Sequence, residues 1–280
     1  MVKLKELRKN ALKDLGATTN DSPLADIDYI LSNLLKFSRT DILLGEKTLD
    51  CNQKKLFDEA FAQLKSGKPV QYTAGGCEFM SLWFETNEST LIPRADTEIL
   101  VELIIEKYKD TGEINILDIG TGTGCIAISL AHFLPHSKVW GIDISAEAIK
   151  TAKKNAKRLG ASDRCSFMEW DILRGFPDLP QQMDIVVSNP PYIPDTDIAG
   201  LDKKVKEFEP LSALAGGNDG LDFFRKITED VKLTKNGCLA FEVGINQAMD
   251  VCDIMSERFC HIETKKDLSG IDRVVFGLFK

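Results

Sequence analysis

The chain has 280 residues, of which 43% are hydrophobic and 28% charged, and its formal net charge is −8 at pH 7. This composition is typical of an ordinary globular protein, and the acidic balance argues against a general nucleic-acid binder, which usually carries a basic surface. No apolar run is long enough to span a bilayer, and the first residues lack the apolar segment of a signal peptide. We therefore expect a cytoplasmic protein of about two domains.

The cysteines and histidines give no indication of a metal site. The sequence has seven cysteines, and none forms a Cys-x-x-Cys pair, so we expect reduced thiols. His132 and His136 have helical i, i+4 spacing, but Pro135 between them should end a helix. We expect no bound metal.

Residues 1–75 have the apolar spacing of several short helices. Helices are expected over 4–15, from Ser22-Pro23 to residue 35, over 41–44 and over 52–65. The expected apolar positions include Leu4, Leu7, Ala11, Leu12, Leu15, Leu24, Ile27, Leu56, Phe57, Ala60 and Leu64. The segment has 12 Lys and Arg against 10 Asp and Glu, a net charge of +2, which leaves −10 for the remainder of the chain. We predict an N-terminal all-α domain that recognises substrate and performs no chemistry.

The following residues change from a helical to an alternating α/β pattern. Glycines at 75 and 76 and an extended run over 78–86 predict a β-hairpin, so residues 76–90 are interpreted as a linker. A helix is expected from Ile99 to Tyr108. Seven strands are then expected, over 114–119, 139–144, 165–171, 183–188, 237–244, 262–266 and 274–279. This alternation predicts a mostly parallel α/β sheet within residues 91–280.

A glycine-rich turn follows the first of these strands. It reads Gly120-Thr121-Gly122-Thr123-Gly124 and precedes a predicted helix, an arrangement that lets the backbone approach a ligand closely. The turn also satisfies a permissive dinucleotide-binding fingerprint, and Asp143 lies where a ribose-binding acid is expected. The turn alone does not distinguish a nicotinamide cofactor from another nucleoside. Asp118 favours the second, because its carboxylate would repel a pyrophosphate but would suit an ammonium group.

S-adenosylmethionine fits this set of residues, with S-adenosylhomocysteine as the product. We expect its amino-acid part at Asp118 and the glycine turn, and its ribose hydroxyls at Asp143. Asp171 would accept from the adenine amine, and Ile172 would lie against the base. Asn189 would lie over the methyl group.

The segment after the fourth predicted strand carries the most informative chemistry, and reads Asn189-Pro190-Pro191-Tyr192. The prolines end the strand, so the segment lies at its carboxyl end, where open α/β sheets bind ligands. The Asn189 side-chain carbonyl and the Pro190 backbone carbonyl can accept both hydrogens of a planar –NH2 group, against which Tyr192 can stack. We predict that all four residues bind substrate and that Asn189, Pro190 and Tyr192 are catalytic, without a general base. Residues 193–221, which have few regular signals, should shape the pocket.

These motifs and five others resemble the release-factor glutamine N5-methyltransferases of the HemK/PrmC type over nearly the whole chain. The other matches are Leu91-Ile92-Pro93-Arg94-x-Asp96-Thr97-Glu98, Glu209-Pro210 with Ala213-Leu214, Gly216-Gly217-x-Asp219-Gly220-Leu221, Glu242-x-Gly244-x-x-Gln247 and Asp267-Leu268-x-Gly270-x-Asp272-Arg273. One departure is Ala95, where the family commonly has proline. The resemblance implies a Rossmann-like methyltransferase sheet and methylation of the glutamine side chain in the Gly-Gly-Gln motif of peptide-chain release factors. We expect a monomer that binds neither nucleic acid nor membrane.

Three alternative functions are open at this point. An adenine-N6 methyltransferase acting on DNA or RNA shares the amine-binding turn, but the acidic charge and the matches outside that turn weigh against it. A nucleotide-binding oxidoreductase is disfavoured by the proline turn and by Asp118. A catalytically silent binding module is disfavoured because the turn and the glycine loop are both intact.

Overall fold

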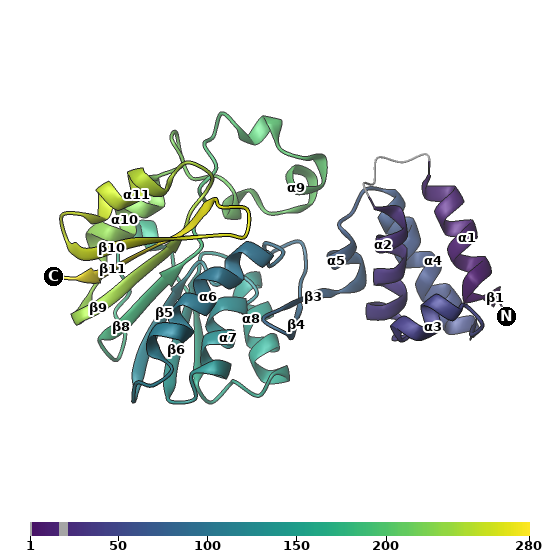
Figure 1. Ribbon diagram of the computed structural model, residues 1–280, viewed down its shortest axis with the longest axis horizontal. Helices are drawn as coiled ribbons and strands as arrows, with labels where there is room; N and C mark the ends of the chain where they lie inside the picture. The colour runs from purple at the N-terminus through teal and green to yellow at the C-terminus, as the bar shows by residue number, and fades with distance from the viewer. Residues whose placement is uncertain (1, 17–21) are drawn as a thin grey trace. The chain divides into compact units, whose positions relative to one another are not determined.

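The structure is a computed structural model that describes residues 2–16 and 22–280 (Figure 1). Met1 and residues 17–21, which fall within the predicted N-terminal domain, lie outside the described residues. The chain forms two compact units. The first contains the residues up to Cys77 together with Asp202–Phe208, and the second contains Glu78–Leu201 and Glu209–Lys280. The predicted boundaries at residues 75 and 90 stay a prediction.

The first unit is a small helical bundle. Its helices are α1 (Leu4–Leu15), α2 (Pro23–Tyr29), α3 (Arg39–Leu44), α4 (Cys51–Lys65), α5 (Val70–Ala74) and α9 (Lys203–Phe208). A π-helix, Ile30–Leu34, continues α2, and strands β1 (Val2–Lys3) and β2 (Thr48–Leu49) pair antiparallel. Pro23 occupies the first turn of α2, while Ser38 and Asp50 each form a capping box at the start of α3 and α4. The four main predicted helices are therefore present, and α5 is one that the sequence pattern did not indicate.

Three leucines expected among the buried apolar positions are instead exposed. The exposed fractions of Leu12, Leu24 and Leu56 are 37%, 42% and 46%. Leu12 and Leu56 each stand beside a buried residue, Ala11 or Phe57, and one step along an α-helix turns a side chain by about 100° away from its neighbour. Leu24 lies in the first turn of α2, one turn before the buried Ile27. The apolar stripe of each helix is therefore narrower than the sequence suggested.

The second unit contains a seven-stranded sheet, as predicted. Its strands are β5 (Ile114–Ile119), β6 (Ser137–Asp143), β7 (Cys165–Glu169), β8 (Met183–Ser188), β9 (Leu233–Glu242), β10 (Phe259–Lys266) and β11 (Asp272–Phe279). The spatial order is β10-β11-β9-β8-β5-β6-β7, and β11 is antiparallel to both of its neighbours while the other neighbouring pairs are parallel. The predicted hairpin is formed by β3 (Gly76–Phe79) and β4 (Leu82–Glu85).

Helices cover both faces of this sheet (Figure 1). On one face α6 (Ala95–Tyr108), α7 (Cys125–Phe133) and α8 (Ala146–Arg158) pack over one apolar cluster, and on the other α10 (Asp222–Asp230) and α11 (Ala248–Met255) pack over a second. Neighbouring residues of β5 point to opposite faces, since Ile116 belongs to the first cluster and Leu117 to the second. A strand buried on both faces has apolar residues at successive positions, as at 116–117 in β5 and 185–187 in β8, and both strands begin and end where the sequence predicted.

Some predicted boundaries were wrong. Helix α6 begins at Ala95 and not at Ile99, because its polar first turn is already helical. Strand β7 ends at Glu169 and not at residue 171, since the Asp171 side chain accepts from the Leu173 backbone and starts a 3-10 turn. Helices α10 and α11 were not predicted. None of the helices in the described part of the chain is long and apolar enough to cross a membrane.

The strand order creates a switch point beside β5. The chain runs from β5 through β6 to β7 on one side, and then returns to β8 on the other side of β5. The loops that follow β5 and β8 therefore leave the sheet in opposite directions and open a crevice at the carboxyl ends of the strands, where such sheets bind ligands.

Candidate active site

A cavity of about 220 Å³ lies at this switch point in the second unit. Its wall includes residues from the carboxyl ends of four strands and the loops after them, namely Ile119, Gly120, Ile142, Asp143, Asp171, Ser188 and Asn189. Pro210, Ser212, Ala213 and Ala215 also line it, so the segment over 193–221 contributes to the cavity wall. The fold thus gathers residues far apart in sequence around one concave site.

The glycine turn forms one side of this cavity. Gly120, Gly122 and Gly124 have φ angles of 74°, 53° and 79°, in the left-handed region that favours glycine. The backbone amides of Gly120 and Thr121 both donate to the Ile142 carbonyl, which fastens the turn to β6. Residues 120–123 of the turn line the cavity. Gly124 does not, because it is the N-cap of α7 and packs against Ile128 and Ala152.

Asp118 lies beneath this turn and is fully buried. Its Oδ2 accepts from the Thr121 hydroxyl at 2.6 Å and from the Ala127 amide at 3.2 Å, while Oδ1 has no hydrogen-bond partner among the described residues. Burial raises the pKa of this carboxyl to about 7, against the lowering effect of those two hydrogen bonds. Asp118 is not part of the cavity wall. Its carboxylate contacts the glycine turn from the side that faces away from the cavity.

Asp143, at the end of β6, faces the cavity from the neighbouring strand. Its two oxygens accept from the backbone amides of Gly122 and Ser145, each at 2.9 Å. Burial raises its pKa, and the same two hydrogen bonds oppose the shift. Each oxygen keeps a further lone pair that a ligand hydroxyl can use.

Asp171 and Ile172 line the cavity beside Asp143. Asp171 caps a short 3-10 turn through the Leu173 amide, at 3.0 Å, and forms an ion pair with Arg174. Ile172 is buried against the cluster under α10 and α11 and offers an apolar surface. A hydrogen-bond acceptor and an apolar surface are therefore adjacent in the cavity wall.

Asn189, Pro190 and Pro191 form the opposite part of the wall. They directly follow strand β8. The end of β8 is held beside β5 by the Ser188 hydroxyl, which donates to the Ile119 carbonyl at 2.7 Å. The Asn189 Nδ2 group donates to the Thr97 hydroxyl oxygen at 3.2 Å, so the nitrogen side of the amide faces helix α6. The side-chain carbonyl oxygen is the group left for a ligand.

Tyr192 is placed differently from its three neighbours. It packs against the apolar cluster under α10 and α11 and is not part of the cavity wall. Its backbone carbonyl accepts from Gln247 Nε2 at 2.9 Å, and burial raises the pKa of its phenol to about 12. A Cβ atom at Gly244 would lie 3.0 Å from its ring, so glycine at this position makes room for the tyrosine. The stacking role predicted for Tyr192 stays a prediction.

The sequence reasoning assigned no role to several residues that the structure brings to the site. Thr97 and Arg94 line the cavity from the start of α6, and the Arg94 guanidinium forms an ion pair with the buried Glu209 carboxylate. Glu242 is buried close to Asn189. Arg94 and Glu209 are 115 positions apart, so only their presence in the family-like motifs singled them out in the sequence.

Comparison with known proteins identifies the class to which this fold and site belong. Residues 110–268 match the family model of a methyltransferase domain, and residues 6–75 match that of the PrmC N-terminal domain. Among solved structures, the hMettl16 catalytic domain in complex with the MAT2A 3′UTR hairpin 6 is 14% identical, with a TM-score of 0.57 over 91% of this chain and 92% of that chain. At this identity the similarity shows the fold alone. The second unit is a methyltransferase domain.

Curated relatives identify the particular family. A release factor glutamine methyltransferase of Bacillus anthracis is 40% identical over 89% of this chain and 90% of the relative. Another, from Clostridium acetobutylicum, is 37% identical over 99% of both chains. The chain belongs to the release factor glutamine methyltransferase family.

Proposed function

We propose that this protein transfers the methyl group of S-adenosylmethionine to the side-chain amide nitrogen of the glutamine in the Gly-Gly-Gln motif of peptide-chain release factors. The observation that carries the proposal is the position of Asn189 and Pro190 on the wall of a cavity at the switch point of a methyltransferase sheet. Membership of the release factor glutamine methyltransferase family supports the substrate.

The residues of the cavity fit S-adenosylmethionine. The glycine turn would hold the amino-acid part, and Asp118 beneath it keeps a buried oxygen, Oδ1, without a partner, which suits a cationic ligand reached directly or through water. Asp143 offers acceptors for the two ribose hydroxyls, and Asp171 and Ile172 offer an acceptor and an apolar face for adenine. When bound, the cofactor supplies an electrophilic methyl group.

The chemical difficulty lies in the acceptor, because an amide nitrogen delocalises its lone pair into the carbonyl and is a weak nucleophile. Asn189 Oδ1 and the Pro190 carbonyl would accept the two N–H groups and hold the nitrogen in line with the methyl group. Both acceptors strengthen their bonds as positive charge develops on that nitrogen, so they stabilise the transition state more than the ground state. The methylated nitrogen is then acidic enough to release a proton without a dedicated base. We therefore assign catalysis to orientation and electrostatics.

Pro191 and Tyr192 would complete the substrate site. Pro191 lines the cavity beside the acceptor groups, and Tyr192 would present its ring to the planar amide once substrate is bound. The helical unit, with its separate core, would recognise the release factor. We propose no contact with nucleic acid, and a monomer as the active form.

Transfer of radiolabelled methyl groups to an intact release factor tests the proposal. We expect label in the release factor and none in a matched variant in which the glutamine of the Gly-Gly-Gln motif is replaced by alanine. DNA and RNA tested in parallel address the adenine-N6 alternative. Label in nucleic acid but not in the release factor would contradict the proposal.

A further inference from the structure

Glu242 is a buried carboxyl that the proposed mechanism does not use. It is the last residue of β9, and the pairing of Ser188 with Phe241 places Asn189 and Glu242 at the same level of neighbouring parallel strands. Its exposed fraction is 2%, and Oε2 has no hydrogen-bond partner among the described residues. A buried carboxyl with a free acceptor is costly to keep, which points to a use.

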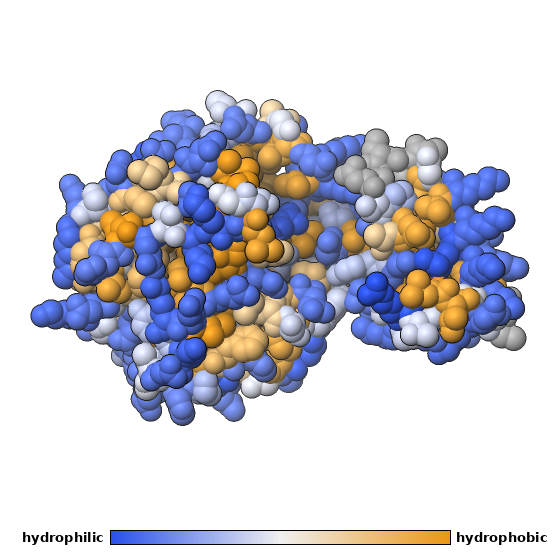
Figure 2. Space-filling model, viewed as in Figure 1, coloured by the Kyte–Doolittle hydropathy of each residue, from blue (hydrophilic) through white to orange (hydrophobic). Residues whose placement is uncertain are grey.

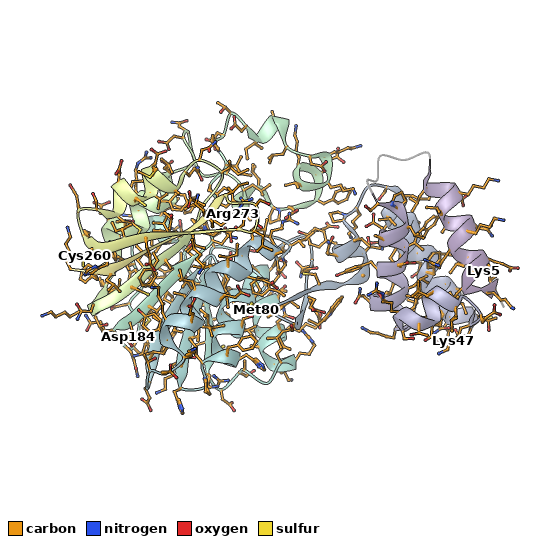
Figure 3. The ribbon with its side chains drawn as sticks, in the orientation of Figure 1. Lys5, Lys47, Met80, Asp184, Cys260 and Arg273 are labelled. Carbon is orange, nitrogen blue, oxygen red and sulfur yellow. The ribbon has the colours of Figure 1, made fainter. Side chains whose placement is uncertain are left out.

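The groups around Glu242 come from every element packed against it. Thr97 on α6 and Asn189 after β8 have polar side chains near its carboxyl, and Asp96 and Arg273 carry charges near it. Arg273, labelled in Figure 3, is itself paired with Asp96 at 3.0 Å. Burial is the largest influence and raises the pKa of Glu242 to about 7. Burial and, next to it, the charge of Glu242 raise the pKa of the Tyr192 phenol.

We propose that Glu242 is a positioning residue that fixes the orientation of the Asn189 amide, so that its carbonyl oxygen faces the cavity. The inference rests on the proposed function, because that orientation is the one an amide substrate requires. Glu242 does not line the cavity formed by the described residues, whereas Asn189 and Thr97 do. It therefore acts through Asn189.

The hydrogen-bond donors and acceptors around Asn189 favour this orientation of its amide. An ionised carboxylate only accepts hydrogen bonds, whereas the Asn189 Nδ2 group has two hydrogens to donate. The Thr97 hydroxyl oxygen takes one of them, which leaves the Thr97 hydroxyl hydrogen available to donate to the carboxylate. The second Nδ2 hydrogen is left for Glu242. A flipped amide would put its oxygen against the carboxylate, which is strongly unfavourable in a buried setting.

Protonation of Glu242 would weaken this control. The neutral acid carries an O–H donor, which can bond the Asn189 oxygen and so tolerate the flipped amide. At saturating cofactor, kcat should therefore rise with pH between about 6 and 8 as Glu242 loses its proton. Asp118, with a similar pKa, would affect cofactor binding and so is silent under saturation.

Kinetics of Glu242→Ala and Glu242→Gln test the inference. We expect Glu242→Ala to lower kcat about 100-fold, the usual effect of a misplaced catalytic group, with cofactor affinity changed less than about threefold. Glu242→Gln keeps one acceptor oxygen, so it should recover part of kcat and lose the rise between pH 6 and 8. Ser129→Ala, which removes a buried hydroxyl that also has no hydrogen-bond partner among the described residues, is the control and should keep wild-type kcat.

A double-mutant cycle with Asn189→Ala separates positioning from a merely structural role. If Glu242 acts through Asn189, its substitution should not lower kcat further once Asn189 is alanine. A folded Glu242→Ala protein with wild-type kcat, or a Gln variant with the wild-type pH profile, would overturn the inference. If Glu242→Ala does not fold, the pH profile of the Gln variant decides. Failure of the wild type to methylate release factor would contradict the proposed function and not the role of Glu242, so the two outcomes are distinguishable.

Discussion

The two units of this protein bury different kinds of side chain. The core of the helical unit is apolar, and Thr73 is the one buried polar side chain among its described residues. The sheet unit buries three carboxyls, those of Asp118, Glu209 and Glu242. Burying a charge is costly unless it is paired or neutralised, so a fold that retains three such groups has a use for them. The chemistry is therefore expected in the sheet unit alone.

Both units expose large apolar side chains, among them Met249 and Leu268 in the sheet unit. In the helical unit Leu43 and Leu44 are adjacent at the end of α3, and their exposed fractions are 68% and 66%. Apolar residues are visible on the surface of this unit in Figure 2. Exposed apolar side chains can be buried by contact with another protein, which is favourable for binding. We propose that catalysis belongs to the sheet unit and that the surface of the helical unit recognises the release factor.

Asn189→Ala should have the largest effect on the methyl-transfer rate. A large loss of rate would support the assignment of catalysis to the sheet unit. Removal of one positioned group of this kind lowers the rate about 10²–10³-fold, and cofactor affinity should fall far less. Asn189→Asp keeps an acceptor but loses the donor group, and Tyr192→Phe keeps the ring. Single-turnover rates should therefore decrease in the order Tyr192→Phe, Asn189→Asp, Asn189→Ala. A wild-type rate for Asn189→Ala would leave the proline turn with a structural role only.

Removal of the helical unit should separate recognition from cofactor binding. A shortened chain that begins at Gly76 should bind S-adenosylmethionine with unchanged affinity, because the cavity lies wholly in the sheet unit. Its kcat/KM on intact release factor should fall about 100-fold, the effect of losing roughly 3 kcal/mol of recognition. The full chain carrying Leu43→Ser and Leu44→Ser is a milder version, expected to raise KM and leave kcat unchanged. Full activity of the shortened chain on release factor would contradict the proposal that the helical unit recognises the substrate.

Asp143→Ala tests cofactor binding within the sheet unit. Loss of its bonds to ligand hydroxyls should weaken binding of S-adenosylmethionine by about 1–3 kcal/mol, which titration calorimetry can measure. Glu147→Ala, on the exposed surface of the next helix, is a matched control that should bind normally. Unchanged affinity in a folded Asp143→Ala protein would rule out the ribose role.

The smallest expected effect is a pH dependence of cofactor binding. With a pKa of about 7, Asp118 is mostly protonated at pH 6 and mostly ionised at pH 8 in the free protein. A cationic ligand favours the ionised form, so binding should release a proton, and affinity should rise about tenfold from pH 6 to pH 8. Calorimetry in buffers of different ionisation enthalpy measures that proton. The rise should be smaller in Asp118→Asn, and an identical rise would show that another group is responsible.

The amino-acid sequence by itself determined the local features. Strands β5 and β8 have apolar central residues, and the glycine turn and Asn189-Pro190-Pro191 follow them with residues that favour a turn. Because parallel strands place their carboxyl ends at one edge of the sheet, these local signals already predicted that the turn and Asn189 would meet. Asp143, Asp171 and Ile172 reach the same cavity for the same reason.

Only the tertiary structure decided which side chains stand behind that cavity. Thr97 contacts Asn189 across 92 positions of the sequence, and Glu242 reaches it through the pairing of β8 with β9. Tyr192 turns away from the wall because Gly244 and Gln247 leave room for it elsewhere. Such contacts depend on strand order and register, which are set by packing of the whole sheet and leave no periodic trace in the local sequence.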